Sequence, residues 1–127
     1  MTVNAKLVSA ALLASSTLAL ADANALRGAA IVASRSQGLC GLCHALPGQP
    51  AHLQGTLGPP LAGVGSRYSA DELRQHLLAP ERFNPDTVMP AYGRSDGLTQ
   101  VAPALRGRPL LAPAQIDDVL AYLASLR

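Results

Sequence analysis

The sequence predicts an all-α fold of about three main helices joined by long loops. Three segments carry apolar residues at helical spacing, and no segment shows sustained alternation of apolar and polar residues. The stretches between these segments are rich in glycine and proline, as loops are. So much irregular chain in a small domain is typical of a fold that is ordered around a bound group.

The N-terminus has the features of a secretory signal peptide. Lys6 is its only positive side chain, an apolar or small run follows over 7–21, and small residues at 21, 23 and 25 offer overlapping cleavage sites. The run is shorter than the roughly 18 to 20 residues that span a bilayer, which disfavours an uncleaved anchor. We therefore predict a cleaved signal peptide over 1–25, one domain over 26–127 and a periplasmic location, with no membrane span in the mature form.

The first helix is expected from Leu26 to Gln37. This segment is rich in alanine and places Leu26, Ala30 and Ala33 on one face. Gly38 follows it at the position where a helix C-cap is expected. Such a helix delivers the chain directly to the first of its two cysteines.

The second helix is expected to begin after Ser69. Ser69 and Glu72 have the spacing of a capping box, and Leu73 and Leu77 lie four residues apart on one helical face. The dipeptide at 79–80, Ala-Pro, ends the segment after about three turns, because the residue before a proline disfavours helical geometry.

The last helix is expected to begin at Pro113, a residue suited to the first helical position. Asp117 and Asp118 near its start and Arg127 at its end match the helix dipole. One apolar face predicts burial of this helix; it comprises Ile116, Val119, Leu120, Leu123 and Leu126.

Both cysteines lie in CGLCH, residues 40–44, a motif with four known uses: a disulfide, a redox pair, half of a zinc site, or covalent haem attachment. A predicted helix rather than a strand precedes the motif, which disfavours a thioredoxin-like pair. Zinc lacks a fourth ligand unless His52 or His76 supplies it. A disulfide would close a very short loop and leave His44 without a role. Haem attachment uses all three residues, because Cys40 and Cys43 form the thioethers and His44 ligates the iron.

The composition also favours a core completed by a cofactor. Cleavage after residue 25 would leave roughly 102 residues, with one Phe, three Tyr and no Trp, to build a core. A porphyrin would supply the large apolar surface that these few aromatic side chains do not. The formal charge of +2 persists after cleavage, and the absence of a basic stripe excludes nucleic acid as the expected partner.

Met89 is predicted to be the sixth ligand of the iron. It is the only methionine of the mature chain and lies in a loop between Pro85 and Pro90, whereas a methionine that fills a core is more typical of a helix face. His76 and His52 are the other candidates for the sixth ligand. His76 is expected at the edge of a helix and His52 in a loop, in both cases without a ligand role. Iron held by histidine and methionine has no open position, which predicts one-electron transfer, at a potential above that of bis-histidine ligation. We expect no catalytic residue on this chain.

The sequence resembles the class I cytochromes c at GLCGLCHALPG, GTLGPPLAGVGSRYS and NPDTVMPAYGR. The resemblance implies the small cytochrome c fold wrapped around one covalently bound haem c. It implies that the Pro59 carbonyl accepts a hydrogen bond from the His44 ring, which fixes the orientation of that ligand. It further implies that Arg67, assisted by Tyr68, pairs with a haem propionate.

With VAPALRGRPLL and AQIDDVLAYLASLR following in order, the chain resembles the X-subunit family of the sulfur-oxidation (Sox) c-type cytochromes over essentially the whole mature chain. Two departures, Ala112-Pro113 and Ala91-Tyr92, are not expected to touch a haem ligand. The resemblance implies a periplasmic heterodimer with an A subunit that also carries haem c. Such a complex couples thiosulfate oxidatively to a cysteine of a sulfur-carrier protein, an L-cysteine S-thiosulfotransferase activity.

Electron counting predicts how the two subunits divide this reaction. Forming a sulfur–sulfur bond from two thiol-level partners releases two electrons, whereas one haem accepts one, and no free cysteine remains on this chain after attachment. We therefore expect the bond to form on the partner, while this chain passes electrons to a small acceptor such as another cytochrome c. A free-standing monohaem carrier and a thiol-disulfide oxidoreductase remain the alternatives, and segment 94–111 is either a partner-binding surface or a solvated loop.

Overall fold

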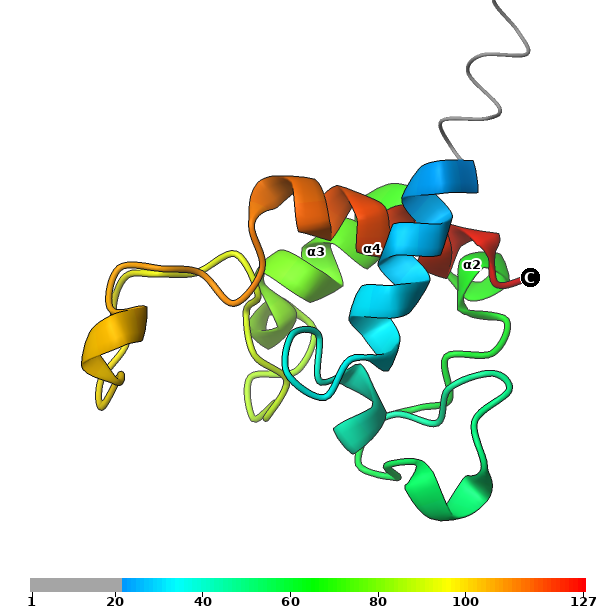
Figure 1. The fold of residues 1–127 in the computed structure, drawn as a ribbon, viewed down its shortest axis with the longest axis horizontal. Helices are drawn as coiled ribbons and strands as arrows, with labels where there is room; N and C mark the ends of the chain where they lie inside the picture. The colour runs from blue at the N-terminus through cyan, green and yellow to red at the C-terminus, as the bar shows by residue number, and fades with distance from the viewer. Residues whose placement is uncertain (1–21) are drawn as a thin grey trace, which may run out of the picture.

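The computed structural model describes residues 22–127, and within them the fold is all-helical, as predicted (Figure 1). The α-helices are a first helix over residues 22–33, α2 (Val64–Arg67), α3 (Ala70–Leu78) and α4 (Pro113–Ser125). Short 3-10 turns interrupt the loops at Cys40–Leu42, Ala51–Leu53, Pro80–Arg82 and Pro103–Leu105. The predicted signal peptide lies almost wholly outside the described residues, and its boundary after Ala25 stays a prediction.

The first helix differs from its predicted bounds and buries a different face. In the part of the chain that the structure describes it covers 22–33, and the expected apolar face of Leu26, Ala30 and Ala33 is exposed, while Ile31 and Val32 are buried. The helix ends early because the chain turns back after it, and the amide of Gly38 donates to the Ile31 carbonyl (3.2 Å). A Cβ on Gly38 would lie 2.4 Å from that carbonyl oxygen, so this glycine closes a turn that follows the helix rather than capping its last residue.

Helix α3 follows its predicted start closely. The Glu72 amide donates to the Ser69 hydroxyl (3.3 Å), and the Ser69 amide donates to the Glu72 carboxylate (2.8 Å), which completes the capping box. Accepting bonds from the Ser69 backbone and side chain lowers the pKa of Glu72. Leu73 and Leu77 are buried, as their spacing predicts.

Helix α4 is the surface against which the other helices pack. Ile116, Val119, Leu120 and Leu123 are buried on its predicted face. The fifth predicted member, Leu126, is only half-buried, because the helix ends at Ser125. The first helix crosses α4 at Gly28, where a Cβ would lie 1.9 Å from the Asp118 carbonyl oxygen. Glycine is required here because any side chain would separate the two backbones.

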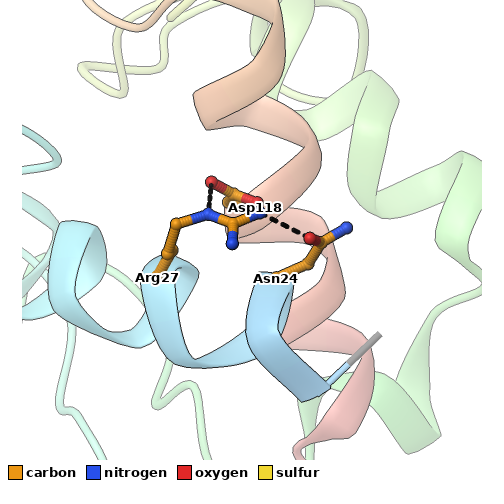
Figure 2. Close-up of polar contacts among 3 residues, drawn as sticks. All are labelled: Asn24, Arg27 and Asp118. Carbon is orange, nitrogen blue, oxygen red and sulfur yellow. Dashed lines mark hydrogen bonds and ion pairs between the residues drawn. The ribbon is translucent and has the colours of Figure 1, made fainter. Parts of the chain in front are cut away.

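A buried carboxylate secures this crossing (Figure 2). Nε and Nη2 of Arg27 donate to the two Asp118 oxygens (2.9 and 2.8 Å), and Nη2 also donates to Asn24. The bond to Asp118 raises the pKa of Arg27. The sequence predicted only an interaction of Asp118 with the helix dipole. The ion pair with Arg27 could not be predicted from spacing, because the two residues lie 91 positions apart.

The short helix α2, which the sequence analysis assigned to a loop, packs against the end of α4. The Gly65 amide donates to the Leu126 carbonyl (2.8 Å), and Arg127 Nη1 donates to the Gly65 carbonyl (2.8 Å). A Cβ on Gly65 would lie 2.4 Å from the Ala124 carbonyl oxygen.

Among residues 22–127, no helix combines the length and the apolar character needed to cross a membrane.

Gly28→Ala is expected to lower the free energy of unfolding by about 2 kcal/mol, because the added methyl group must push the first helix off the α4 backbone. Denaturant unfolding of the haem-loaded protein measures the change. Ala30→Ser, an exposed position on the same helix, is the control and is expected to shift stability by less than about 0.5 kcal/mol. Wild-type stability in Gly28→Ala would contradict a close crossing at this residue.

Candidate haem-binding site

The cysteine motif forms a compact turn that gathers its reactive side chains. Leu39 has a left-handed backbone (φ 59°) and opens the 3-10 turn Cys40–Leu42, and the His44 amide donates to the Cys40 carbonyl (2.9 Å). The two sulfurs are not bonded to one another. Burial raises the pKa of the Cys40 thiol. The arrangement thus presents two thiols and an imidazole from five consecutive residues.

The His44 ring is held in one orientation by a backbone carbonyl. Its Nδ1 lies 2.7 Å from the Pro59 carbonyl oxygen. Because a carbonyl only accepts hydrogen bonds, this contact selects the tautomer of the neutral ring in which Nδ1 carries the hydrogen and Nε2 has the lone pair. That nitrogen is the one free to ligate a metal.

The loop that carries Pro59 is paired along the cysteine motif. Its amides donate to carbonyls of the motif from Gly55 to Gly41 (2.9 Å), from Gly58 to Cys43 (2.8 Å) and from Leu61 to Ala45 (2.9 Å). Gly58 lies directly against the imidazole, since a Cβ there would be 2.3 Å from the His44 Cε1 atom. Glycine at 58 therefore lets the loop approach closely enough for the next carbonyl to reach the ring.

Arg67 is hydrogen-bonded to the same loop at two carbonyls that follow Pro59. Its Nη1 and Nη2 donate to the carbonyls of Ala62 and Pro60, both at 2.6 Å. A guanidinium has five N–H donors, so donors remain for an anionic group. The neighbouring Tyr68 is partly exposed and meets His76 edge to face, with ring centroids 5.0 Å apart.

The two other histidines take no part in the geometry around His44. His76 is half-buried and stacks on Phe83, with ring centroids 3.7 Å apart. His52 is exposed in the turn Ala51–Leu53. The aromatic group of Tyr68, His76 and Phe83 was not foreseen in the sequence, because its members come from three separate elements.

Met89 lies in the loop between the turn Pro80–Arg82 and segment 91–92, and it is half-buried against the edge of the core. Its amide donates to the Thr87 hydroxyl (3.1 Å). The loop is tied to the cysteine motif at Tyr92, whose hydroxyl donates to the Gly38 carbonyl (2.7 Å). The fold therefore links the methionine segment to the attachment segment.

Each of the two loops that carry Pro59 and Met89 exposes a large apolar side chain. Leu57 and Val88, next in sequence to Gly58 and Met89, are 77% and 78% exposed. One of them lies in the loop of the Pro59 carbonyl and the other precedes Met89, so both suit contact with an apolar group. Two thiols that can attach a haem, and an imidazole nitrogen and a thioether that can ligate its iron, are the groups of a haem c site.

The comparisons with known proteins agree with this site. The family model of cytochrome c matches residues 25–127. The chain belongs to the cytochrome c family. A covalently bound haem c follows from this membership, and when bound it supplies a reversible one-electron iron couple. No curated protein was matched.

Among solved structures, the chain is similar to one in the crystal structure of SoxXA from P. pantotrophus. The identity is 30%, the match covers 79% of each chain, and the TM-score is 0.69. This likeness and the family match place the cytochrome with the SoxX-type class I cytochromes c.

Gly58→Ala is expected to displace the His44 ring, because the new methyl group would overlap it. Haem should remain attached through the two cysteines on a denaturing gel, while the native absorption spectrum loses low-spin character. Gly48→Asn is the control, because Gly48 has a left-handed φ of 74°, which asparagine tolerates, and a Cβ added there would meet no atom within 4 Å. A wild-type spectrum in Gly58→Ala would contradict the role given to this contact.

Proposed function

We propose that this chain is a periplasmic monohaem c-type cytochrome that acts as the electron-accepting subunit of a thiosulfate-oxidising complex. The observation that carries the proposal is the likeness to a chain of SoxXA from P. pantotrophus, at 30% identity over 79% of both chains. The site supports it, because two cysteines that can attach a haem lie beside an imidazole whose Nδ1 is held by a carbonyl. If Met89 supplies the second ligand, the iron has no open position, which favours electron transfer over bond-making.

His44 and Met89 are the proposed axial ligands of a single haem. The His44 Nε2 lone pair is available because the Pro59 carbonyl engages Nδ1. Met89 supplies a soft thioether from a loop tied to the cysteine motif. Cys40 and Cys43 would hold the haem covalently, each through one thioether bond.

Arg67 and Tyr68 are the proposed contacts of a haem propionate. Two hydrogen bonds to carbonyls hold the Arg67 guanidinium beside the loop that carries Pro59. Its remaining N–H donors suit a carboxylate. Tyr68 adjoins it in sequence and is partly exposed.

The thiosulfate reaction needs groups that this chain does not offer. Joining the outer sulfur of thiosulfate to a carrier thiol forms one S–S bond and releases one proton and two electrons. Both cysteines of this chain are used by haem attachment, so the bond is expected to form on the partner. This chain would take electrons singly and pass them to a small acceptor such as another cytochrome c.

Segment 94–111 supports the presence of a partner subunit. It extends away from the helical body as an arm (Figure 1). Leu98, Leu105 and Leu110 on this arm are each about half exposed. An A-type haem subunit is the proposed occupant of this surface, in a heterodimer.

Met89→Ala is expected to abolish the far-red absorption band that arises from sulfur ligation of oxidised haem iron. Haem content should not change, because both cysteines remain. Met89→His should restore low-spin ligation at a lower reduction potential, since histidine favours the ferrous state less than a thioether does. Persistence of the far-red band in Met89→Ala would show that another residue ligates the iron.

Thiosulfate is expected to reduce the haem of this chain only when the A-type haem subunit and a cysteine-bearing carrier protein are both present. Absorbance of the ferrous haem reports the reaction, and a carrier with its cysteine replaced by serine is the control. Reduction by thiosulfate in the isolated chain would contradict the proposed division of labour. A monomeric protein that no mixture reduces would instead indicate a free-standing carrier.

A further inference from the structure

Tyr92 is the most firmly anchored residue of the methionine segment. Its side chain is buried, with 4% of the residue exposed. Its amide donates to the Leu77 carbonyl (2.9 Å) and its carbonyl accepts from the Leu111 amide (3.1 Å). Its hydroxyl donates to the Gly38 carbonyl (2.7 Å), 54 residues back in the chain. One residue thus joins the end of α3, the segment just before α4 and the segment just before the cysteine motif.

The hydroxyl of Tyr92 reaches the immediate surroundings of a haem-attachment residue. Gly38 precedes Cys40 by two positions, and the Cys40 thiol donates to the same carbonyl oxygen (3.4 Å). Burial raises the pKa of Cys40, and the Tyr92 hydroxyl acts in the opposite direction. Burial also raises the pKa of Tyr92, so the hydroxyl remains a donor at neutral pH. The departure at Ala91-Tyr92 therefore contacts neither expected iron ligand, but its hydroxyl bonds to a carbonyl two residues before Cys40.

Haem attachment would leave the Gly38 carbonyl with one side-chain donor instead of two. Thioether formation transfers the sulfur-bound hydrogen of Cys40 to a vinyl carbon, so the sulfur can no longer donate. The Gly38 carbonyl then keeps the Tyr92 hydroxyl as its side-chain donor. Leaving a buried carbonyl without a donor costs folding free energy, so the bond from Tyr92 stabilises the haem-loaded protein.

We propose that Tyr92 is a positioning residue for Met89: its hydroxyl ties the segment that carries the methionine to the segment that carries Cys40, and so holds the thioether in place for the iron. The inference rests on the proposed ligation by Met89. Tyr92 follows Met89 by three residues, so a shift of its ring moves the loop that presents the sulfur. The hydroxyl acts through the loop and touches neither axial ligand.

The test is Tyr92→Phe in the haem-loaded protein, titrated with imidazole while the far-red band of the oxidised form is followed. Phenylalanine keeps the ring and removes one oxygen. Imidazole competes with Met89 for the iron, so its apparent affinity reports how firmly the methionine is held. Loss of one buried hydrogen bond predicts roughly fivefold tighter imidazole binding. Tyr122→Phe is the matched control, because Tyr122 is a half-buried tyrosine on α4 whose hydroxyl makes no hydrogen bond within residues 22–127.

Repeating the comparison of Tyr92 with Tyr92→Phe in protein that also carries Met89→Ala distinguishes two effects of the hydroxyl. One is to position Met89, and the other is to stabilise the haem site as a whole. With no methionine to displace, Tyr92→Phe is expected to leave imidazole affinity unchanged there. An equal gain in both backgrounds, no gain in either, or loss of haem binding in Tyr92→Phe alone would overturn the proposal. Failure of Met89 ligation is distinguishable, because the wild-type protein would then lack the far-red band, and Tyr92 would have no axial methionine to position.

Discussion

The hydrogen bond between the His44 ring and the Pro59 carbonyl is the contact on which the site depends. It assigns the ring hydrogen to Nδ1 and leaves Nε2 for iron. The bond is possible only because the loop over 55–61 runs along the cysteine motif, with Gly58 in van der Waals reach of the imidazole. Arg67 holds the same loop through hydrogen bonds to the carbonyls of Pro60 and Ala62. Because backbone atoms hold the His44 ring, its orientation should stay the same when the iron changes oxidation state.

The helices serve mainly to hold such loops in register. Helix α4 receives the first helix at Gly28 and α2 at Gly65, and both contacts bring backbones closer than any side chain would allow. The first helix leads into the cysteine motif, and α2 follows the loop that carries Pro59. The two segments that orient His44 are therefore positioned by one shared helix. On the methionine side, Tyr92 connects α3, the approach to α4 and Gly38.

Local patterns predicted the structure well wherever the cause was local. The capping box at Ser69 and the apolar face of α4 follow from spacing alone, and both are confirmed except at Leu126, which lies past the end of the helix. The first helix was misplaced because its composition is uniformly rich in alanine, and the crossing with α4, not its own periodicity, decides which face is buried. The partners of Asp118 and Tyr92 lie 91 and 54 residues away, where spacing gives no signal. The cysteine motif indicated haem from its chemistry, whereas the aromatic group around His76 exists only after folding.

Proton NMR of the reduced, haem-loaded protein tests the central claim, that His44 and Met89 close the iron on both faces. A methionine bound to ferrous haem places its methyl protons over the porphyrin ring, whose ring current shifts them far upfield of every other resonance. Ligation by Met89 should give one such methyl signal, and its absence in Met89→Ala assigns it. A reduced protein without this signal, with imidazole resonances from a second histidine in its place, would contradict the ligation by methionine and the electron-transfer role built on it.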